Sequence, residues 1–192
     1  MNDLDKYFEV VSVENDKESQ IIVIDIKIFD LKLKKLIDKC LVSICDDDID
    51  SELKYVKKRL YLFLISKSNS TVETGAIAEF FIHLILNQYG FKQEFTFFNL
   101  EERSIKKGFD GYYSFKKEPW IMESKSGDIS TKKITHKSKI NEAYKDLEGK
   151  LIGKAQNNPW QNAYNHAKVV GSSNNILNKI KELKRSEEHT SE

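Results

Sequence analysis

The sequence contains little that would cross-link the chain or anchor it. Its two cysteines, Cys40 and Cys45, are too few to hold a chain of 192 residues together with disulfides, so we expect free buried thiols in a reducing, cytoplasmic environment. Four scattered histidines make a zinc site of the Cys/His kind improbable. No apolar run reaches the roughly 18 residues of a spanning helix. The acidic start lacks an apolar signal core, so secretion is not expected.

The composition is typical of a soluble globular protein. Hydrophobic residues make up 40% and charged residues 32% of the chain, enough for one sizeable core. The net charge of +1 conceals an uneven distribution, because residues 126–184 hold 11 lysines against 5 acidic residues, a local charge of +6. This basic last third indicates a polyanionic partner, although lysine-rich helices are often simple solvated faces.

Hydrophobic periodicity predicts a β-rich N-terminal module, residues 1–66, with one helix. The segment SKSNST, residues 66–71, has no apolar residue and is the clearest linker. In the following unit, residues 71–184, a helix precedes three strands and further helices. This order predicts an α/β or α+β fold with a central mixed sheet flanked by helices. The expected strands are 8–13, 20–29, 40–45, 91–98, 109–115 and 120–125, and the expected helices are 51–65, 72–89, 136–156, 160–170 and 174–184.

The last eight residues, RSEEHTSE at 185–192, are similar to the translation of one reading frame of a widely used sequencing-adapter oligonucleotide. We therefore expect a non-native, adapter-derived tail, with the natural chain interrupted near Lys184, and leave these residues out of the fold prediction. An ordinary polar terminus is the alternative.

The most informative segment is GFDGYYSFKKEPWIMESKSG, residues 108–127. Two strands flank a predicted four-residue turn, 116–119, which pairs Phe115 with Trp120 and sets Asp110 opposite Lys125. Because side chains alternate along a strand, one face is polar and the other belongs to the core. The polar face holds Asp110, Tyr112, Glu123 and Lys125; the apolar face holds Tyr113, Phe115, Trp120 and Met122.

The charged residues of this polar face suit phosphodiester chemistry. Asp110 and Glu123 can bridge a hard cation such as Mg²⁺ or Mn²⁺, and the carbonyl oxygen of Ser124 would add a ligand. Lys125 would orient or deprotonate an attacking water and offset charge on the phosphate. The pattern therefore indicates metal-assisted hydrolysis. The alternative is an ordinary salt bridge between Asp110 and Lys125 on a solvated face.

Glu79 is a further candidate ligand. It is the one mid-helix carboxylate of an otherwise apolar helix, which we expect to be largely buried, and a buried charge is costly unless it is paired or ligated. Gly75, one turn earlier, would permit close approach of another backbone. The alternative is a narrow polar stripe that faces water, and the spacing does not decide between the two. The stripe consists of Gly75, Glu79, His83 and Asn87.

Together, Glu79 on a first helix, Asp110 on one strand and Glu123-Ser124-Lys125 on the next resemble the active site of the PD-(D/E)xK, or restriction-endonuclease-like, nuclease superfamily. The resemblance implies a restriction-endonuclease-like core in which the acids bind one or two Mg²⁺ ions and the lysine assists the attacking water.

The similarity spans about residues 71–170, roughly half of the chain, and its motif is short. Phe109 stands where the family name has proline, a common departure. The runs GAIAEFF, GFDGYY, PWIMESKSG and NNPWQNAYNHA look most like the nuclease subunit of Hachiman-type antiphage systems, which works with a helicase. This resemblance implies DNA as substrate, a role in antiviral defence and a helicase partner.

Several residues outside the motif are candidates for substrate binding. Basic residues after the motif would contact phosphates, with a solvated helix start as the alternative for each: Lys132, Lys133, His136, Lys137 and Lys139. RecB-like members of the superfamily carry a Gln and a Tyr four residues apart on a later helix. Gln161 and Tyr164 are three apart and are therefore weaker candidates. We expect His83, His166 and Trp160 to be structural.

The sequence therefore predicts a divalent-metal-dependent nuclease that hydrolyses DNA, with catalytic residues Glu79, Asp110, Glu123 and Lys125. RNA is an open alternative as substrate. Two other functions stay open: a non-catalytic subunit that keeps the fold and binds nucleic acid or protein, and a nuclease held inactive until a helicase or another partner releases it.

Overall fold

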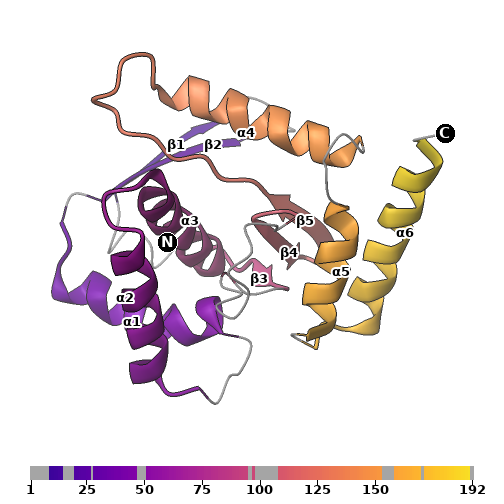
Figure 1. The fold of residues 1–192 in the computed structure, drawn as a ribbon, viewed down its shortest axis with the longest axis horizontal. Coiled ribbons are helices and arrows are strands. Elements are labelled where there is room, and N and C mark those ends of the chain that lie inside the picture. Colours follow the sequence, from indigo (N-terminus) through magenta and orange to yellow (C-terminus); the bar gives the residue numbers. More distant parts are fainter. Residues whose placement is uncertain are drawn as a thin grey trace.

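The computed structural model describes residues 9–14, 20–26, 28–46, 51–94, 97, 108–152, 158–169 and 171–190. These residues form a mixed α and β structure, as expected, with six helices, a two-stranded hairpin and a three-stranded sheet (Figure 1). The expected mixed sheet is, among these residues, small and entirely antiparallel. None of their helices has the length and apolar character needed to cross a membrane.

The N-terminal part of the chain holds a β-hairpin followed by helices. Strands β1 (Glu9–Glu14) and β2 (Gln20–Asp25) pair antiparallel. Helices α1 (Leu31–Cys45), α2 (Leu53–Ser66) and α3 (Thr71–Gln88) follow. The prediction of a strand at 40–45 is wrong, because these residues form the end of α1. Periodicity cannot separate a short apolar run from a buried helix segment. Asp30 caps the start of α1 by accepting hydrogen bonds from backbone N–H groups, and the residues 40–45 at its end pack into a core shared with α2 and α3.

One apolar core joins α1, α2 and α3 across the expected linker. Its buried members are Leu33, Leu36, Cys40, Leu41, Ile44, Cys45, Val56, Phe80, Leu84 and Phe97. The segment SKSNST is a tight connection between α2 and α3, in which the hydroxyl of Ser70 accepts a hydrogen bond from the backbone N–H of Glu73. Residues on both sides of the segment therefore share one core. Helix α3 is less buried than expected, because Ile77 is 41% exposed.

The sheet has the order β3 (Lys92–Gln93), β4 (Gly111–Phe115), β5 (Glu118–Met122). In the β4–β5 hairpin, Tyr113 pairs with Trp120 and Phe115 with Glu118. The predicted register, with Phe115 opposite Trp120, is therefore wrong by two residues. Because this shift is even, each side chain keeps its predicted face.

The shift arises from the turn, which has two residues rather than four. Lys116 and Lys117 both have positive φ, 50° and 71°, as in the type I′ turns whose twist matches that of the flanking strands. Asn-Gly is the usual sequence signal for this turn, and Lys-Lys does not provide it. Pro119, which was expected in the turn, instead lies within the edge strand β5, opposite Ser114.

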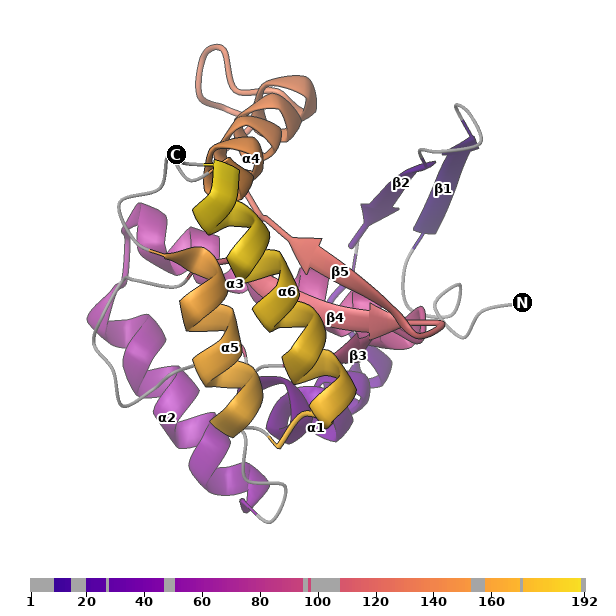
Figure 2. The same cartoon turned by 90° about the vertical axis from the view of Figure 1, so that its right-hand side faces the viewer.

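Both faces of the hairpin are covered by helices. Helix α3 packs on one face, and α5 (Pro159–Val169) and α6 (Asn174–Thr190) pack on the other (Figures 1 and 2). The second core consists of Phe109, Tyr112, Trp160, Ala163, Ala167, Ile176 and Ile180. The face that we expected to be polar therefore belongs to this core, in which Tyr112 is 0% exposed.

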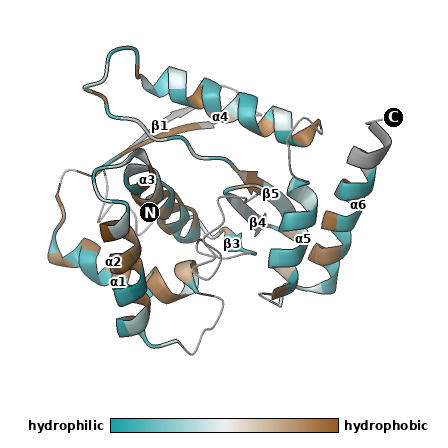
Figure 3. Cartoon of the chain, viewed as in Figure 1, coloured by the Kyte–Doolittle hydropathy of each residue, from teal (hydrophilic) through white to brown (hydrophobic). Residues whose placement is uncertain are grey.

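Helix α4 (His136–Leu151) differs from the others, because none of its residues is buried. It begins with a capping box, in which Thr135 and Ser138 exchange side-chain and backbone hydrogen bonds. Hydrophilic residues extend along much of it (Figure 3). The helix lies outside the layers formed by the sheet and by α3, α5 and α6.

The turn supplies a first prediction. Replacing Lys116 by Asn and Lys117 by Gly removes two left-handed lysines and should raise the free energy of unfolding by about 1 kcal/mol. Urea denaturation measures the change. The control Lys116→Gln removes a charge but keeps the strained conformation, so it should give no gain. Equal or lower stability of the double variant would contradict the assigned turn.

Candidate active site

The predicted catalytic residues of the hairpin lie at its open end, away from the turn. Gly111 pairs with Met122, so Asp110 immediately precedes β4 and Glu123 immediately follows β5. The corrected register thus brings these two acids to the same end of the hairpin. Asp110 was expected opposite Lys125, which instead lies beyond the end of β5.

Asp110 is held by the chain that leaves β5. Its Oδ2 atom accepts hydrogen bonds from both the backbone N–H and the hydroxyl of Ser124, each at 2.8 Å. Two donors on one oxygen fix the carboxylate and the start of the extended segment 123–128. Ser124 thus contacts Asp110 through its N–H and hydroxyl groups, whereas its carbonyl oxygen was the expected metal ligand.

Glu123 is nearly buried, with its side chain 3% exposed, and each of its carboxylate oxygens meets an ammonium group. Oε1 accepts a hydrogen bond from Lys125 at 2.8 Å, and Oε2 accepts one from Lys150 of α4. Lys125 also lies 2.5 Å from Oδ2 of Asp146, again on α4. The order Lys150–Glu123–Lys125–Asp146 alternates in sign, so the network is neutral.

This network keeps Lys125 positively charged. Burial lowers the pKa of its ammonium group, but the hydrogen bonds to Asp146 and Glu123 and their charges raise the pKa by more, so that it lies above its usual value. In this arrangement the group can orient a water or stabilise negative charge. The other predicted role, deprotonation of the water, would require the neutral amine.

Glu79 lies on α3 in a polar stripe that packs on the hairpin. Its Oε1 atom is 3.7 Å from Nε2 of His83, which is 0% exposed and shares a hydrogen bond with the hydroxyl of Tyr113 through Nδ1. A Cβ atom on Gly75 would lie 3.7 Å from Oγ of Ser126. The alternative that the stripe faces water is therefore wrong.

The negative charge of Glu79 acts on Tyr113 of β4. Burial, and then the negative charge of Glu79, raises the pKa of Tyr113 above its usual value. Asp110 and Glu123 lie just outside the paired strands. Within the part of the chain that the structure describes, no group of three or more His, Cys, Asp or Glu side chains is arranged to hold a metal ion.

The chemistry of Asp110 and Glu123 suits a hard divalent cation, but their present partners compete with it. Carboxylate oxygens are the preferred protein ligands of Mg²⁺. Both oxygens of Glu123 are paired with lysines, and one oxygen of Asp110 is paired with Ser124. A divalent cation at Glu123 would have to replace at least one of these lysine partners.

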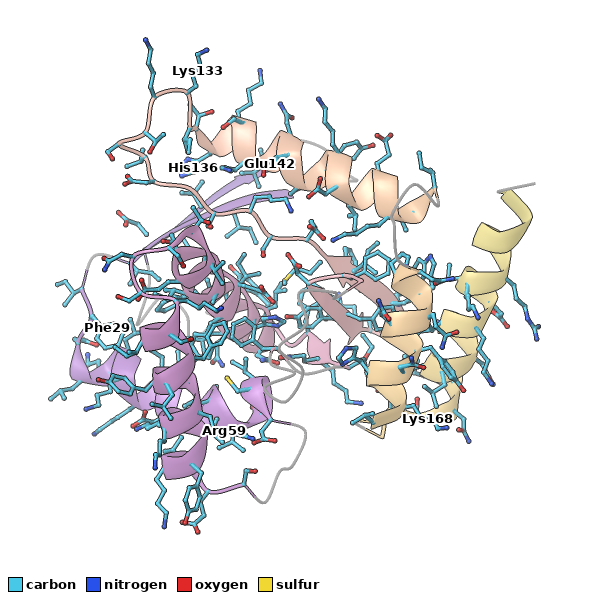
Figure 4. All side chains as sticks on the ribbon, in the orientation of Figure 1. Phe29, Arg59, Lys133, His136, Glu142 and Lys168 are labelled. Atoms are coloured by element: carbon cyan, nitrogen blue, oxygen red, sulfur yellow. The ribbon has the colours of Figure 1, made fainter. Side chains whose placement is uncertain are left out.

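The candidate substrate-binding residues fall into two groups. Lys132, Lys133 and Lys137 are exposed and lie in the loop before α4 and in its first turn. Figure 4 labels Lys133 in this loop. Gln161 and Tyr164 instead join α5 to α6. The side-chain oxygen of Gln161 accepts a hydrogen bond from Lys184 at 2.8 Å, and the ring of Tyr164 lies under Lys181.

Sequence reasoning missed Asp146 and Lys150, although opposite charges four residues apart on a helix were a visible signal. It also missed Glu94, which is 2% exposed and accepts hydrogen bonds from the hydroxyls of Ser114 and Ser172 at 2.6 Å and 2.9 Å. Glu94 thereby ties the connection between α5 and α6 to the sheet.

Comparisons of this chain with protein-family models, curated proteins and solved structures give no match. The nuclease resemblance of the short motifs therefore stays a prediction.

The buried tyrosines predict a loss of stability at alkaline pH. Burial, and then the charge of Glu94, raises the pKa of Tyr112 to about 12 from 10.0, and the pKa of Tyr113 is also raised. The folded protein therefore keeps both phenolic protons above about pH 10, while the unfolded chain loses them. The free energy of unfolding should fall there by about 1.4 kcal/mol per pH unit for each tyrosine.

Urea denaturation between about pH 8 and pH 11 tests this expectation. The double variant Tyr112→Phe, Tyr113→Phe should lose most of the pH dependence. The exposed Tyr144 provides the control, because Tyr144→Phe should retain it. A free energy of unfolding that stays constant in the wild-type chain up to pH 11 would contradict the prediction.

Proposed function

We propose that this protein is a divalent-metal-dependent nuclease that hydrolyses phosphodiester bonds of DNA. The observation that carries the proposal is the nearly buried Glu123, which lies beside Asp110 at the open end of the hairpin and is paired with Lys125. Two carboxylates and a fixed ammonium group are the set that metal-assisted phosphodiester hydrolysis needs.

Each residue has a separate role in the proposal. A bound Mg²⁺ or Mn²⁺ ion supplies Lewis acidity and lowers the pKa of a bound water. Asp110 and Glu123 provide oxygen ligands, and Ser124 holds Asp110 in place. Lys125 stays protonated and stabilises the charge that develops on the phosphate. Glu79 of α3 would be the third acid of the set, and its charge also acts on Tyr113.

In this proposal, DNA contacts the protein at the loop before α4 and at the first turn of that helix, together called the basic loop. Lys132, Lys133 and Lys137 are exposed there, and lysines that neutralise phosphates dominate sequence-independent binding of DNA. The similarity of the motifs to Hachiman-type nuclease subunits extends the proposal to a cytoplasmic antiviral effector that works with a helicase.

One observation favours a second candidate function, a non-catalytic subunit that retains the fold and binds nucleic acid or protein. Both oxygens of Glu123 are already neutralised by lysines, as in a purely structural ion-pair network. This candidate predicts DNA or protein binding without a carboxylate-dependent site for Mg²⁺ or Mn²⁺.

Substitution of the site residues tests the nuclease proposal. Glu123→Gln and Lys125→Ala should each lower Mg²⁺-dependent cleavage of DNA at least about 100-fold, because each removes a charge that acts on the reacting phosphate or its metal. The matched controls Glu118→Gln and Lys145→Ala change exposed residues and should cleave as the wild type does. Equal cleavage by all four variants would place the activity elsewhere, and circular dichroism verifies that each variant is folded.

The basic loop gives a separate prediction about DNA binding. Replacing Lys132, Lys133 and Lys137 by Ala should weaken binding and lower the slope of log affinity against log salt by about 2 to 3, because each phosphate contact contributes about 0.9. Fluorescence anisotropy with EDTA, between about 50 and 200 mM salt, measures the slope without cleavage. The control replaces three exposed lysines near α2: Lys54, Lys58 and Lys67. A slope that falls equally in both variants would contradict a specific role of the loop.

A further inference from the structure

Helix α4 runs back along the extended segment that leaves β5, and the contacts between them are antiparallel (Figure 1). Glu123 meets Lys150 near the end of the helix, and Lys125 meets Asp146 one turn earlier. At the start of the helix, a Cβ atom on Gly127 would lie 2.8 Å from Cε of Lys139. The helix and the segment are thus aligned along their whole shared length.

The two ion pairs fit the geometry of both elements. Two residues of extended chain, from Glu123 to Lys125, span about 6.6 Å. Four residues of helix, from Asp146 to Lys150, span about 6 Å. Read in the direction of the segment, the charges on the segment are negative and then positive. Read in the same direction, those on the antiparallel helix are positive, from Lys150, and then negative, from Asp146. Both pairs can therefore form together, and a helix shifted by one residue would lose them.

These ion pairs, rather than apolar burial, hold this part of α4. None of its 16 residues is buried, and Leu147 is its partly buried contact with the second core. Asp146 is half exposed, whereas Glu123 is only 3% exposed. Glu123 therefore depends on its ion pairs more than Asp146 does, because a buried carboxylate must be paired.

We propose that the ammonium group of Lys150 pairs with Oε2 of Glu123 in the candidate site and competes there with a divalent metal ion. The proposal rests on the proposed nuclease function and adds its regulation. A divalent ion binds to Glu123 only as the Lys150 ammonium group withdraws, and this releases the last turn of α4 from Glu123. Lys125 stays on Oε1, held also by Asp146.

The variant Lys150→Met tests this competition, because it removes the charge and keeps most of the apolar stem. Glu123 remains paired with Lys125, so the fold should persist. Binding of Mn²⁺ to the full chain, measured as loss of the free-ion signal in electron paramagnetic resonance, should tighten about tenfold. The control Lys145→Met lies on the same helix, is exposed and should bind Mn²⁺ as the wild type does. Adding Glu123→Gln to Lys150→Met should abolish the gain.

Amide hydrogen exchange gives a second readout that does not depend on activity. Saturating Mn²⁺ should speed exchange in residues 148–151 of the wild-type chain, because the ion replaces Lys150 on Glu123 and releases the last turn of α4. Exchange in α5 should stay unchanged.

The outcomes separate failure of this inference from failure of the proposed function. Glu123-dependent Mn²⁺ binding with equal affinity in the wild type and Lys150→Met would overturn the competition and leave the nuclease proposal standing. The absence of Glu123-dependent Mn²⁺ binding in every variant would overturn both. Tighter binding in Lys145→Met as well would show a general charge effect and would also overturn the competition at Lys150.

Discussion

The side chain of Glu123 is nearly buried, and two ammonium groups meet its two carboxylate oxygens. One comes from Lys125, two residues later, and the other from Lys150, which is distant in sequence. A carboxylate without such partners would be costly at this depth. The same pairing joins α4, a helix with no buried residue, to the sheet. The pairing of Glu123 therefore concerns both the candidate chemistry and the attachment of the end of this helix.

The hairpin that carries Glu123 is covered on both faces, and this limits where polar chemistry can occur. On the α3 face, the hydroxyl of Tyr113 is satisfied by His83. On the sheet edge, Glu94 is satisfied by Ser114 and Ser172. These buried polar groups stabilise the packing of helices on the sheet. Asp110 and Glu123 differ from them, because they lie where the paired strands end and the chain opens toward α4.

The lysine pairing also connects the functions that the sequence left open. A nuclease needs Glu123 for a divalent cation, whereas a structural network needs it for Lys150. If Lys150 is a displaceable cation, the same arrangement serves both, and the chain alternates between a closed and a metal-binding state. A DNA or protein partner that contacts the exposed α4 could then favour one state over the other. A partner that favours the metal-binding state would release the nuclease, which is one of the alternatives that the sequence left open.

The sequence by itself determined the class of fold, the positions of most helices and the existence of the hairpin, because these follow from local periodicity and capping. It also singled out Asp110, Glu123 and Lys125, and an even register shift left their faces unchanged. Only the tertiary structure decided that 40–45 is helical, that two lysines make the turn, and that Lys150 reaches Glu123. These depend on contacts between distant segments and on a turn without its usual residues, and local patterns carry no information about which distant charges will meet.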